Sequence, residues 1–416
     1  MNGRRLAPVA LLLLVAAAAS CARLPAPVEV PGLAIEDPSF GPTLEAYVGA
    51  SARRGNRVTV LLNGDQIFPA QLAAICSAKQ TVTYAQYFYE DGPPARDIVD
   101  ALSERCAAGV KGHVLLDAVG TVNMPPEFRQ ELESAGCEVA TFRPLDPIDL
   151  KKVDNRNHRR ILVVDGRVGF TGGSGASSKW MGNGLMQGQW RQTDVRVEGP
   201  VVNDLQAAFV ENWREATGRA LGGPGYFSRP VKRGDVIAQV VRSSPATGSY
   251  ATYTMFLLAM SSARQRIYIT NPYFVPDEEM TDAMVRARRR GVRIVLMLPG
   301  KIDHEIVRQA SKAGFGRLLE AGVEIYEYRA GLLHAKTMTV DGVWATIGSA
   351  NLDNRSFARN DEINLVVYDR GEAARLEKIF AEDLMRSERV DLATWQARGL
   401  WDRFREWLSL PVRSEI

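Results

Sequence analysis

Hydrophobic and polar positions follow one plan that occurs twice along the chain. In each half, a stretch with helical spacing precedes an apolar run, a second helix ends at a glycine, and another apolar run follows. The matched segments, first half and then second, are 69–78 and 252–264, 81–88 and 266–274, and 113–117 and 292–298. The pattern indicates an internal duplication.

Apolar runs that alternate with helices of ten or more residues indicate βαβ units, which build α/β folds. We therefore expect the α/β class, with two tandem pseudo-symmetric domains, each a mostly parallel or mixed sheet flanked by helices. Glycine and proline at 222–225 interrupt the pattern between the two copies. Placing the boundary there gives domains at 42–224 and 225–416.

The first 21 residues have the pattern of an export signal. Two arginines precede an apolar run at 6–15, and small residues lead into Cys21. This run is shorter than the roughly 20 residues that cross a bilayer. The segment resembles a bacterial lipobox, so we expect lipidation of Cys21, with ordinary cleavage nearby as the alternative. A proline-rich stretch, 22–41, would then tether an exported lipoprotein to the periplasmic side of a membrane.

Composition and charge narrow the class of protein. Hydrophobic residues make up 46% and charged residues 24% of the 416 positions, which is typical of a globular enzyme or binding protein. Lysine and arginine number 51 against 48 acidic residues, for a net charge of +3. So even a balance argues against a strongly basic nucleic-acid-binding face, and no nucleic acid partner is expected.

The four cysteines are spaced irregularly and include no C-x-x-C pair. This spacing argues against a zinc site and against a disulfide framework. With Cys21 assigned to lipid, we expect the other three to be unpaired thiols that fill the core, namely Cys76, Cys106 and Cys137.

Candidate chemistry lies in two matched motifs, each a histidine with a cation two residues later and an aspartate seven residues later. The six residues are His158, Arg160 and Asp165 in the first half and His334, Lys336 and Asp341 in the second. On a strand, positions i and i+2 share a face, so each His and its cation can reach one anionic group. One such motif alone would suit a hydrogen-bonded strand residue beside a solvated cation, but its repetition favours a phosphate site.

These motifs resemble the signature of the phospholipase D superfamily, which continues with a glycine pair or Gly-Ser and a later asparagine. The second copy matches through Asn351, whereas the first has Arg160 for lysine and Gly175 for asparagine. The chain is most similar to the bacterial cardiolipin synthase-like branch. Segments that carry this likeness are 270–277, 298–301, 321–326, 351–356 and 360–362.

The resemblance implies a double displacement that needs no metal or other cofactor. One imidazole attacks phosphorus to form a phosphohistidine, and the other protonates the leaving alcohol and later deprotonates the acceptor. By family analogy His158 is the nucleophile and His334 the acid/base, although the variation in the first motif leaves the reverse open. Arg160 and Lys336 would neutralise phosphate oxygens.

Other residues receive supporting roles from the same resemblance. Asn351 and Ser349 are candidate substrate-binding residues. Each imidazole needs an acceptor on its other nitrogen. We expect Glu362 to serve His334 and Asp194 to serve His158, with a solvated strand carboxylate as the alternative for Asp194.

The motif aspartates and the remaining histidines have simpler expected roles. Asp165 and Asp341 each precede a glycine, and we expect them to brace the turn after the strand. His113 and His304 have no such motif and are expected to be ordinary residues.

The expected activity is a cardiolipin synthase-like phosphatidyl transfer at a membrane surface. A phosphatidyl group from phosphatidylglycerol would move through His158 to a second phosphatidylglycerol, which yields cardiolipin and glycerol. With water as acceptor, the same site would be a phospholipase D. A nuclease or other phosphodiesterase is a further alternative. Arg160 and Gly175 also keep open an inactive phospholipid-binding protein.

Overall fold

A computed structural model describes residues 32–145, 154–302, 305–399 and 401. The predicted signal segment, Cys21 and His304 lie outside the described residues. Ile35 and Phe40, at the end of the predicted tether, are buried in the core of the second half, and the Ile35 N–H donates to the Ser262 carbonyl at 3.1 Å. This end of the tether is therefore folded rather than extended.

The first half follows a short helix, α2 (Phe40–Val48). Its elements are β1 (Arg53–Leu62), α3 (Asn63–Cys76), β2 (Thr81–Gln86), α4 (Pro93–Ala107), β3 (Lys111–Asp117), α5 (Pro126–Ser134), β4 (Glu138–Phe142), β5 (Ile161–Val164), β6 (Val168–Thr171), η1 (Ser178–Trp180), β7 (Trp190–Arg191), β8 (Thr193–Glu198) and α7 (Val202–Thr217).

The second half repeats this order after a stretch, 218–235, that carries neither helix nor strand. Its elements are β9 (Val236–Ser243), η2 (Pro245–Thr247), α8 (Ala251–Ser262), β10 (Arg266–Thr270), β11 (Phe274–Val275), α9 (Glu278–Arg289), β12 (Arg293–Pro299), α10 (Glu305–Ala313), α11 (Phe315–Glu320), β13 (Glu324–Tyr328), β14 (Leu332–Leu333), β15 (Thr337–Val340), β16 (Trp344–Gly348), β17 (Leu352–Asp353), α12 (Asn354–Ala358), β18 (Glu362–Tyr368), α13 (Arg370–Leu384), β19 (Ser387–Arg389) and α14 (Leu392–Gln396).

The two halves share one continuous mixed sheet. Among the described residues it has 15 strands, in the order β19-β13-β12-β10-β15-β16-β18-β9-β1-β8-β6-β5-β2-β3-β4. β9 and β1 pair antiparallel at the centre, and the strands on either side correspond in sequence order. Within this sheet, parallel pairing is confined to β2-β3-β4 and β10-β12-β13, and two separate two-stranded sheets, β11-β17 and β7-β14, are also parallel. The prediction of an α/β fold from duplicated halves is confirmed, and the halves are fused edge to edge.

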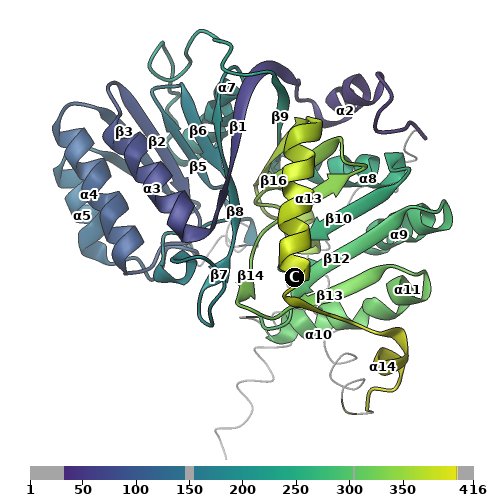
Figure 1. Cartoon of the computed structure of the whole chain (residues 1–416). Helices are drawn as coiled ribbons and strands as arrows, with labels where there is room; N and C mark the ends of the chain where they lie inside the picture. The colour runs from purple at the N-terminus through teal and green to yellow at the C-terminus, as the bar shows by residue number, and fades with distance from the viewer. Residues whose placement is uncertain (1–31, 146–153, 303–304, 400, 402–416) are drawn as a thin grey trace, which may run out of the picture.

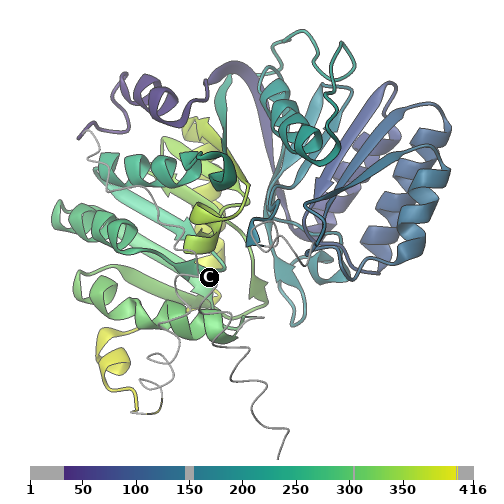
Figure 2. The ribbon, with the colours of Figure 1, turned by 180° about the vertical axis from the view of Figure 1, so that it is seen from behind.

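Helices cover both faces of this sheet (Figures 1 and 2). On one face, α7 and α13 pack on the central strands in a single apolar cluster that spans both halves. On the other face, α3, α4 and α5 form one cluster and α8, α9 and α11 form another. The shared cluster fixes one half relative to the other, which a site between the halves requires.

The cysteines differ from the prediction. Cys106 and Cys137 form a disulfide with Cα atoms 5.3 Å apart, and Cys76 is exposed rather than in the core. The bond links the end of α4 to the start of β4, and both sulfur atoms lie over Gly112, which has no side chain to displace them. A sequence separation of 31 gives no recognisable signature, because the contact depends on how the helix packs on the sheet.

No helix in the described parts of the chain is both long and apolar enough to cross a membrane.

Candidate active site

His158 lies just before β5 and is held by a residue of the other half. Its Nδ1 is 2.8 Å and 3.0 Å from the two carboxylate oxygens of Glu362, the first residue of β18. The His158 N–H also donates to the Asp361 carbonyl at 3.0 Å, so backbone pairing brings the two segments together. Ser349 donates its hydroxyl to the same carboxylate.

His334 occupies the equivalent position in the second half. Its N–H donates to the Arg191 carbonyl at 2.8 Å, and its Nδ1 lies 3.1 Å from the amide oxygen of Gln192. Asp194 accepts bonds from the Gly173 N–H, the Ser174 hydroxyl and the Gln192 amide. The first half therefore reaches His334 through a neutral amide.

The predicted pairing of acceptors is wrong. Glu362 contacts His158 rather than His334, and Asp194 contacts Gln192 rather than His158. The physical reason is that each histidine-bearing segment crosses to pair with the strand end of the opposite half. Gln192 was not predicted, because a carboxylate is the usual acceptor for a catalytic imidazole. The signal was available, since Arg191 and Gln192 occupy the places that Asp361 and Glu362 occupy in the other copy.

Two buried cations accompany the imidazoles. Lys336 places Nζ 3.2 Å from both ring nitrogens of His334 and 2.7 Å from its carbonyl oxygen. Arg160 packs its guanidinium 5.1 Å above the Tyr87 ring and donates to the His158 carbonyl. The Nε of Arg160 has no partner within the described part of the protein. A donor of this kind is suited to an entering anion.

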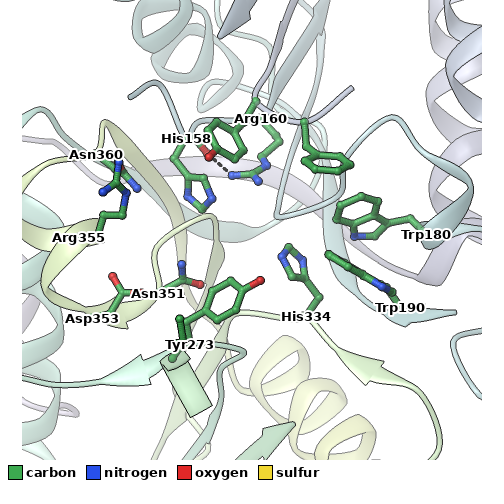
Figure 3. A pocket seen from close by; sticks show the side chains of 13 residues that line it. His158, Arg160, Trp180, Trp190, Tyr273, His334, Asn351, Asp353, Arg355 and Asn360 are labelled. Atoms are coloured by element: carbon green, nitrogen blue, oxygen red, sulfur yellow. Dashed lines mark hydrogen bonds between the residues drawn. The ribbon is translucent and has the colours of Figure 1, made fainter. Parts of the chain in front are cut away.

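A cavity of about 300 Å³ joins the two halves of the site. Its wall is formed by Tyr87, Phe88, His158, Arg160, Trp180, Trp190, Tyr273, Val307, His334, Asn351, Asp353, Arg355 and Asn360. Figure 3 shows both imidazoles directed into it, with the polar side chains gathered on one side and the tryptophans beside His334 on the other. Both imidazoles therefore line one cavity.

The tryptophan side explains the departure at Gly175. A Cβ at this position would lie 2.7 Å and 2.8 Å from atoms of the Trp180 ring. Trp180 therefore fills the space that the asparagine of a complete motif would need, and Asn351 lines the cavity without a counterpart at position 175. Ser349, expected to bind substrate, instead lies behind Glu362 and is not part of the cavity wall.

The motif aspartates act on the backbone. Asp165 accepts bonds from the N–H groups of residues 79–81, and Asp341 accepts bonds from those of residues 264–266. Both residues have positive φ, at 52° and 53°. Neither is part of the cavity wall. Their carboxylates therefore tie the turn after each motif strand to the start of β2 or β10.

Electrostatics favour the neutral form of both imidazoles. Burial, followed by the charges of Arg160 and Lys336, lowers the pKa of His158. Burial, followed by the charges of Lys336 and Arg160, lowers the pKa of His334. Burial also raises the pKa of Glu362, against the opposing effects of its Ser349 hydrogen bond and the nearby cations. With Nδ1–H donated to Glu362, the tautomer of His158 leaves Nε2 with a free lone pair.

His113 lies away from the cavity. Its ring packs edge-on against Trp213 and Tyr226, and its Nε2 is 3.7 Å from Glu138. Burial lowers the pKa of His113. These contacts are those of a packed core residue.

Known proteins are similar to this chain over most of its length. A family model described as "Cardiolipin synthase, PLD-like domain" matches residues 71–183 and 256–384, one block in each half. A cardiolipin synthase of Geobacillus kaustophilus is 34% identical over 357 residues, which cover 85% of this chain and 71% of the relative. The major cardiolipin synthase ClsA of Bacillus subtilis is 34% identical over 358 residues, covering 85% and 74%.

A solved structure shares the fold at lower identity. The phosphatidylserine synthase of Haemophilus influenzae superimposes with a TM-score of 0.66 and 12% identity, covering 91% of this chain and 100% of the other. The shared arrangement is that of two fused α/β halves.

Proposed function

Because the chain belongs to the cardiolipin synthase family of phospholipase D-like proteins, we propose that it transfers a phosphatidyl group from phosphatidylglycerol through a phosphohistidine. The chain is a cardiolipin synthase-like phosphatidyltransferase. The observation that carries the proposal is the pair of buried imidazoles, one from each half, that face a single cavity together with Arg160 and Lys336.

In the first step, the Nε2 lone pair of His158 attacks phosphorus and the bond from phosphorus to the glycerol oxygen breaks. His334, which takes up a proton once the phosphate anion offsets the charges of Lys336 and Arg160, gives that proton to the glycerol oxygen, and glycerol leaves. Arg160 and Lys336 balance the charge that grows on the non-bridging oxygens. In the second step, His334 takes a proton from an acceptor hydroxyl, the new oxygen–phosphorus bond forms, and the nitrogen–phosphorus bond breaks.

Glu362 supports the choice of His158 as nucleophile. Attack on phosphorus through Nε2 leaves the imidazole ring with a positive charge, because Nδ1 keeps its proton. A carboxylate at 2.8 Å stabilises that charge, whereas His334 has a neutral amide in the equivalent place. The asymmetry favours a covalent intermediate on His158.

The test is a product assay with phosphatidylglycerol vesicles, with and without EDTA. We expect cardiolipin and glycerol in both conditions and none from His334→Ala. The matched control is Arg167→Ala, which changes an exposed cation on the turn after β5. Phosphatidic acid as the only product would identify a hydrolase, and vesicle binding without product would identify an inactive lipid-binding protein.

The proposal includes a membrane surface as partner. Two loops next to cavity residues expose apolar side chains: Val122 is 71% and Met186 is 62% exposed. The loop that carries Val122 accepts a hydrogen bond at the Gly120 carbonyl from the N–H of Tyr89, which is two residues from Tyr87. The loop that carries Met186 connects Trp180 to Trp190. Apolar side chains around a lipid-binding cavity suit insertion among headgroups and acyl chains.

A vesicle assay tests this surface. Val122→Asp and Met186→Asp should weaken activity on vesicles and leave activity on a soluble short-chain phosphatidylglycerol unchanged. Val231→Asp is the control, because Val231 is exposed and lies near Gly55, at the end of β1 remote from the site. Equal vesicle activity in all three variants would contradict the assignment.

Export and lipidation at Cys21 remain part of the proposal on the grounds of the N-terminal pattern. The disulfide between Cys106 and Cys137 supports an oxidising compartment, because such bonds are rare in reducing cytosol. Mass analysis of the mature protein from a native membrane fraction tests it. A lipid-modified N-terminal cysteine is expected, and an intact leader would contradict it.

A further inference from the structure

We propose that Gln192 is the positioning residue of His334 and that Asp194 holds its amide, so that the acid/base imidazole works without an anion in direct contact. This inference rests on the proposed function, since it assigns His334 the acid/base role. It concerns a chain of side chains that runs away from the cavity, from His334 through Gln192 to Asp194 and Ser174.

The hydrogen-bonded side chains of Gln192 and Asp194 are buried, and the direction of the bond between them is fixed. Gln192 and Asp194 are 0% and 2% exposed. The Gln192 amide nitrogen donates to Asp194 Oδ1 at 2.6 Å and to the Thr193 carbonyl at 3.0 Å. The Thr193 carbonyl can only accept, and the Asp194 carboxylate accepts as well, so the amide nitrogen faces these two groups and the amide oxygen faces His334.

This orientation fixes the tautomer of His334. The Gln192 oxygen, 3.1 Å from Nδ1, accepts a bond, so Nδ1 carries the proton in the neutral ring. Nε2 is then the atom that exchanges a proton with the substrate oxygens. Without Asp194 only the Thr193 carbonyl would hold the amide nitrogen, and an amide that turned would bring its nitrogen to Nδ1.

The partners of His334 also determine how readily this ring is protonated. Lys336, Arg160 and His158 all face His334 and disfavour its protonation, and the Tyr273 ring approaches it at 6.2 Å. Asp194 is one side chain further away and supplies no direct ion pair. In contrast, His158 meets the Glu362 carboxylate directly. The two imidazoles are thus given different acidities by their partners.

A charge-conserving exchange provides the test. The double variant Gln192→Glu/Asp194→Asn keeps the side-chain lengths and the net charge, but moves the carboxylate next to His334. We expect the pKa of His334 to rise by about one unit or more, since an opposite charge within a few ångströms shifts a pKa by about 1–3 units. The limb of the rate profile on which His334 must be protonated moves to higher pH.

Ring ¹⁵N NMR reads the proton directly, because the chain has only four histidines and each can be assigned by substitution. The expected wild-type spectrum has His334 protonated at Nδ1, and the double variant has a raised titration midpoint for this ring alone. An unchanged midpoint in a folded double variant, or an Nε2–H tautomer in the wild type, would overturn the inference. Gln192→Leu, which removes the acceptor, should lose that tautomer preference.

The NMR readout separates this inference from the proposed function. If wild-type protein forms no product from phosphatidylglycerol but shows the expected tautomer and the shift in the double variant, the function fails and the positioning role stands. If cardiolipin forms while the rings of wild type and double variant titrate alike, the positioning role fails.

Discussion

Asp353 lies in the cavity wall and caps the N-terminus of α12, where it accepts the Ser356 N–H at 2.7 Å. Burial raises its pKa from 3.8 to about 7. A raised pKa in the folded state means that protonation stabilises the fold, so this contribution is present below pH 3.8 and is lost as the pH rises through 7.

Asp353→Asn should therefore stabilise the folded protein, relative to wild type, more at high pH than at low pH. Asparagine keeps an oxygen for the cap and stays neutral. The difference in Tm between variant and wild type should be more positive at about pH 8.5 than at about pH 5. Asp369→Asn, at the cap of α13 and outside the cavity, is the control. The same difference at both pH values would contradict the raised pKa of Asp353.

Glu362 is expected to matter for rate more than for folding. Glu362→Gln preserves shape and leaves a neutral partner for His158, so the charge formed on attack loses its carboxylate. We expect kcat to fall by about a hundredfold or more, the scale of general acid/base contributions. Glu377→Gln, which breaks an ion pair with Arg266 outside the cavity wall, should retain activity. A rate near wild type for Glu362→Gln would remove the charge argument.

At the scale of elements, the turns after β5 and β15 are stabilised in the same way in both halves. In each motif, the segment just before the strand carries a His and a cation toward the cavity, and the aspartate just after the strand binds three successive N–H groups. The strand is thereby fixed at the end opposite its histidine. In each motif, the first residues line the cavity and the final aspartate stabilises the backbone.

Asp341→Ala tests this division. Loss of the acceptor leaves three partly buried N–H groups without their partner, which costs roughly 1–2 kcal/mol. Differential scanning calorimetry should show a lower Tm, while kcat measured well below that Tm stays near wild type. Asp341→Asn, which tolerates the positive φ, should recover part of the loss. A large fall in kcat at unchanged Tm would give Asp341 a direct part in the chemistry instead.

The disulfide holds the α4 end and the start of β4 together, far along the sheet from its centre. Closing a loop of 31 residues restricts the unfolded chain and is worth roughly 3–4 kcal/mol. The double variant Cys106→Ser/Cys137→Ser should unfold at a lower temperature and become insensitive to reductant. Cys76→Ser serves as control. A Tm equal to wild type under oxidising conditions would contradict the contribution.

At the scale of the whole molecule, the repeat made the fold readable from sequence. Matched helices, apolar runs and glycine stops predict two α/β halves, and the His-x-cation pattern predicts which strands carry the chemistry. The pattern of one half contains no information on how β1 and β9 join, because backbone pairing between edges depends on geometry rather than on residue type. The exchange of Glu362 and Gln192 between halves follows from that junction.

The tryptophan wall was also beyond sequence reasoning. Trp180 and Trp190 lie in the segment between the first motif and β8, where no repeat partner marks them. From the sequence, Gly175 only indicated that the asparagine amide of the motif is lacking. The structure shows that the Trp180 ring occupies the space that a side chain at position 175 would need. Such exchanges of one group for another become visible only when side-chain volumes are in place.

The most direct measurement follows the phosphatidyl group itself. Wild-type protein is mixed with phosphatidylglycerol for less than one turnover, quenched in alkali, digested and analysed by mass spectrometry. The account predicts a phosphatidyl adduct on the peptide that contains His158, absent from His158→Ala. Turnover with the adduct on the His334 peptide, or with no adduct on either, would contradict the central claim that both imidazoles act on one phosphoester with His158 as nucleophile.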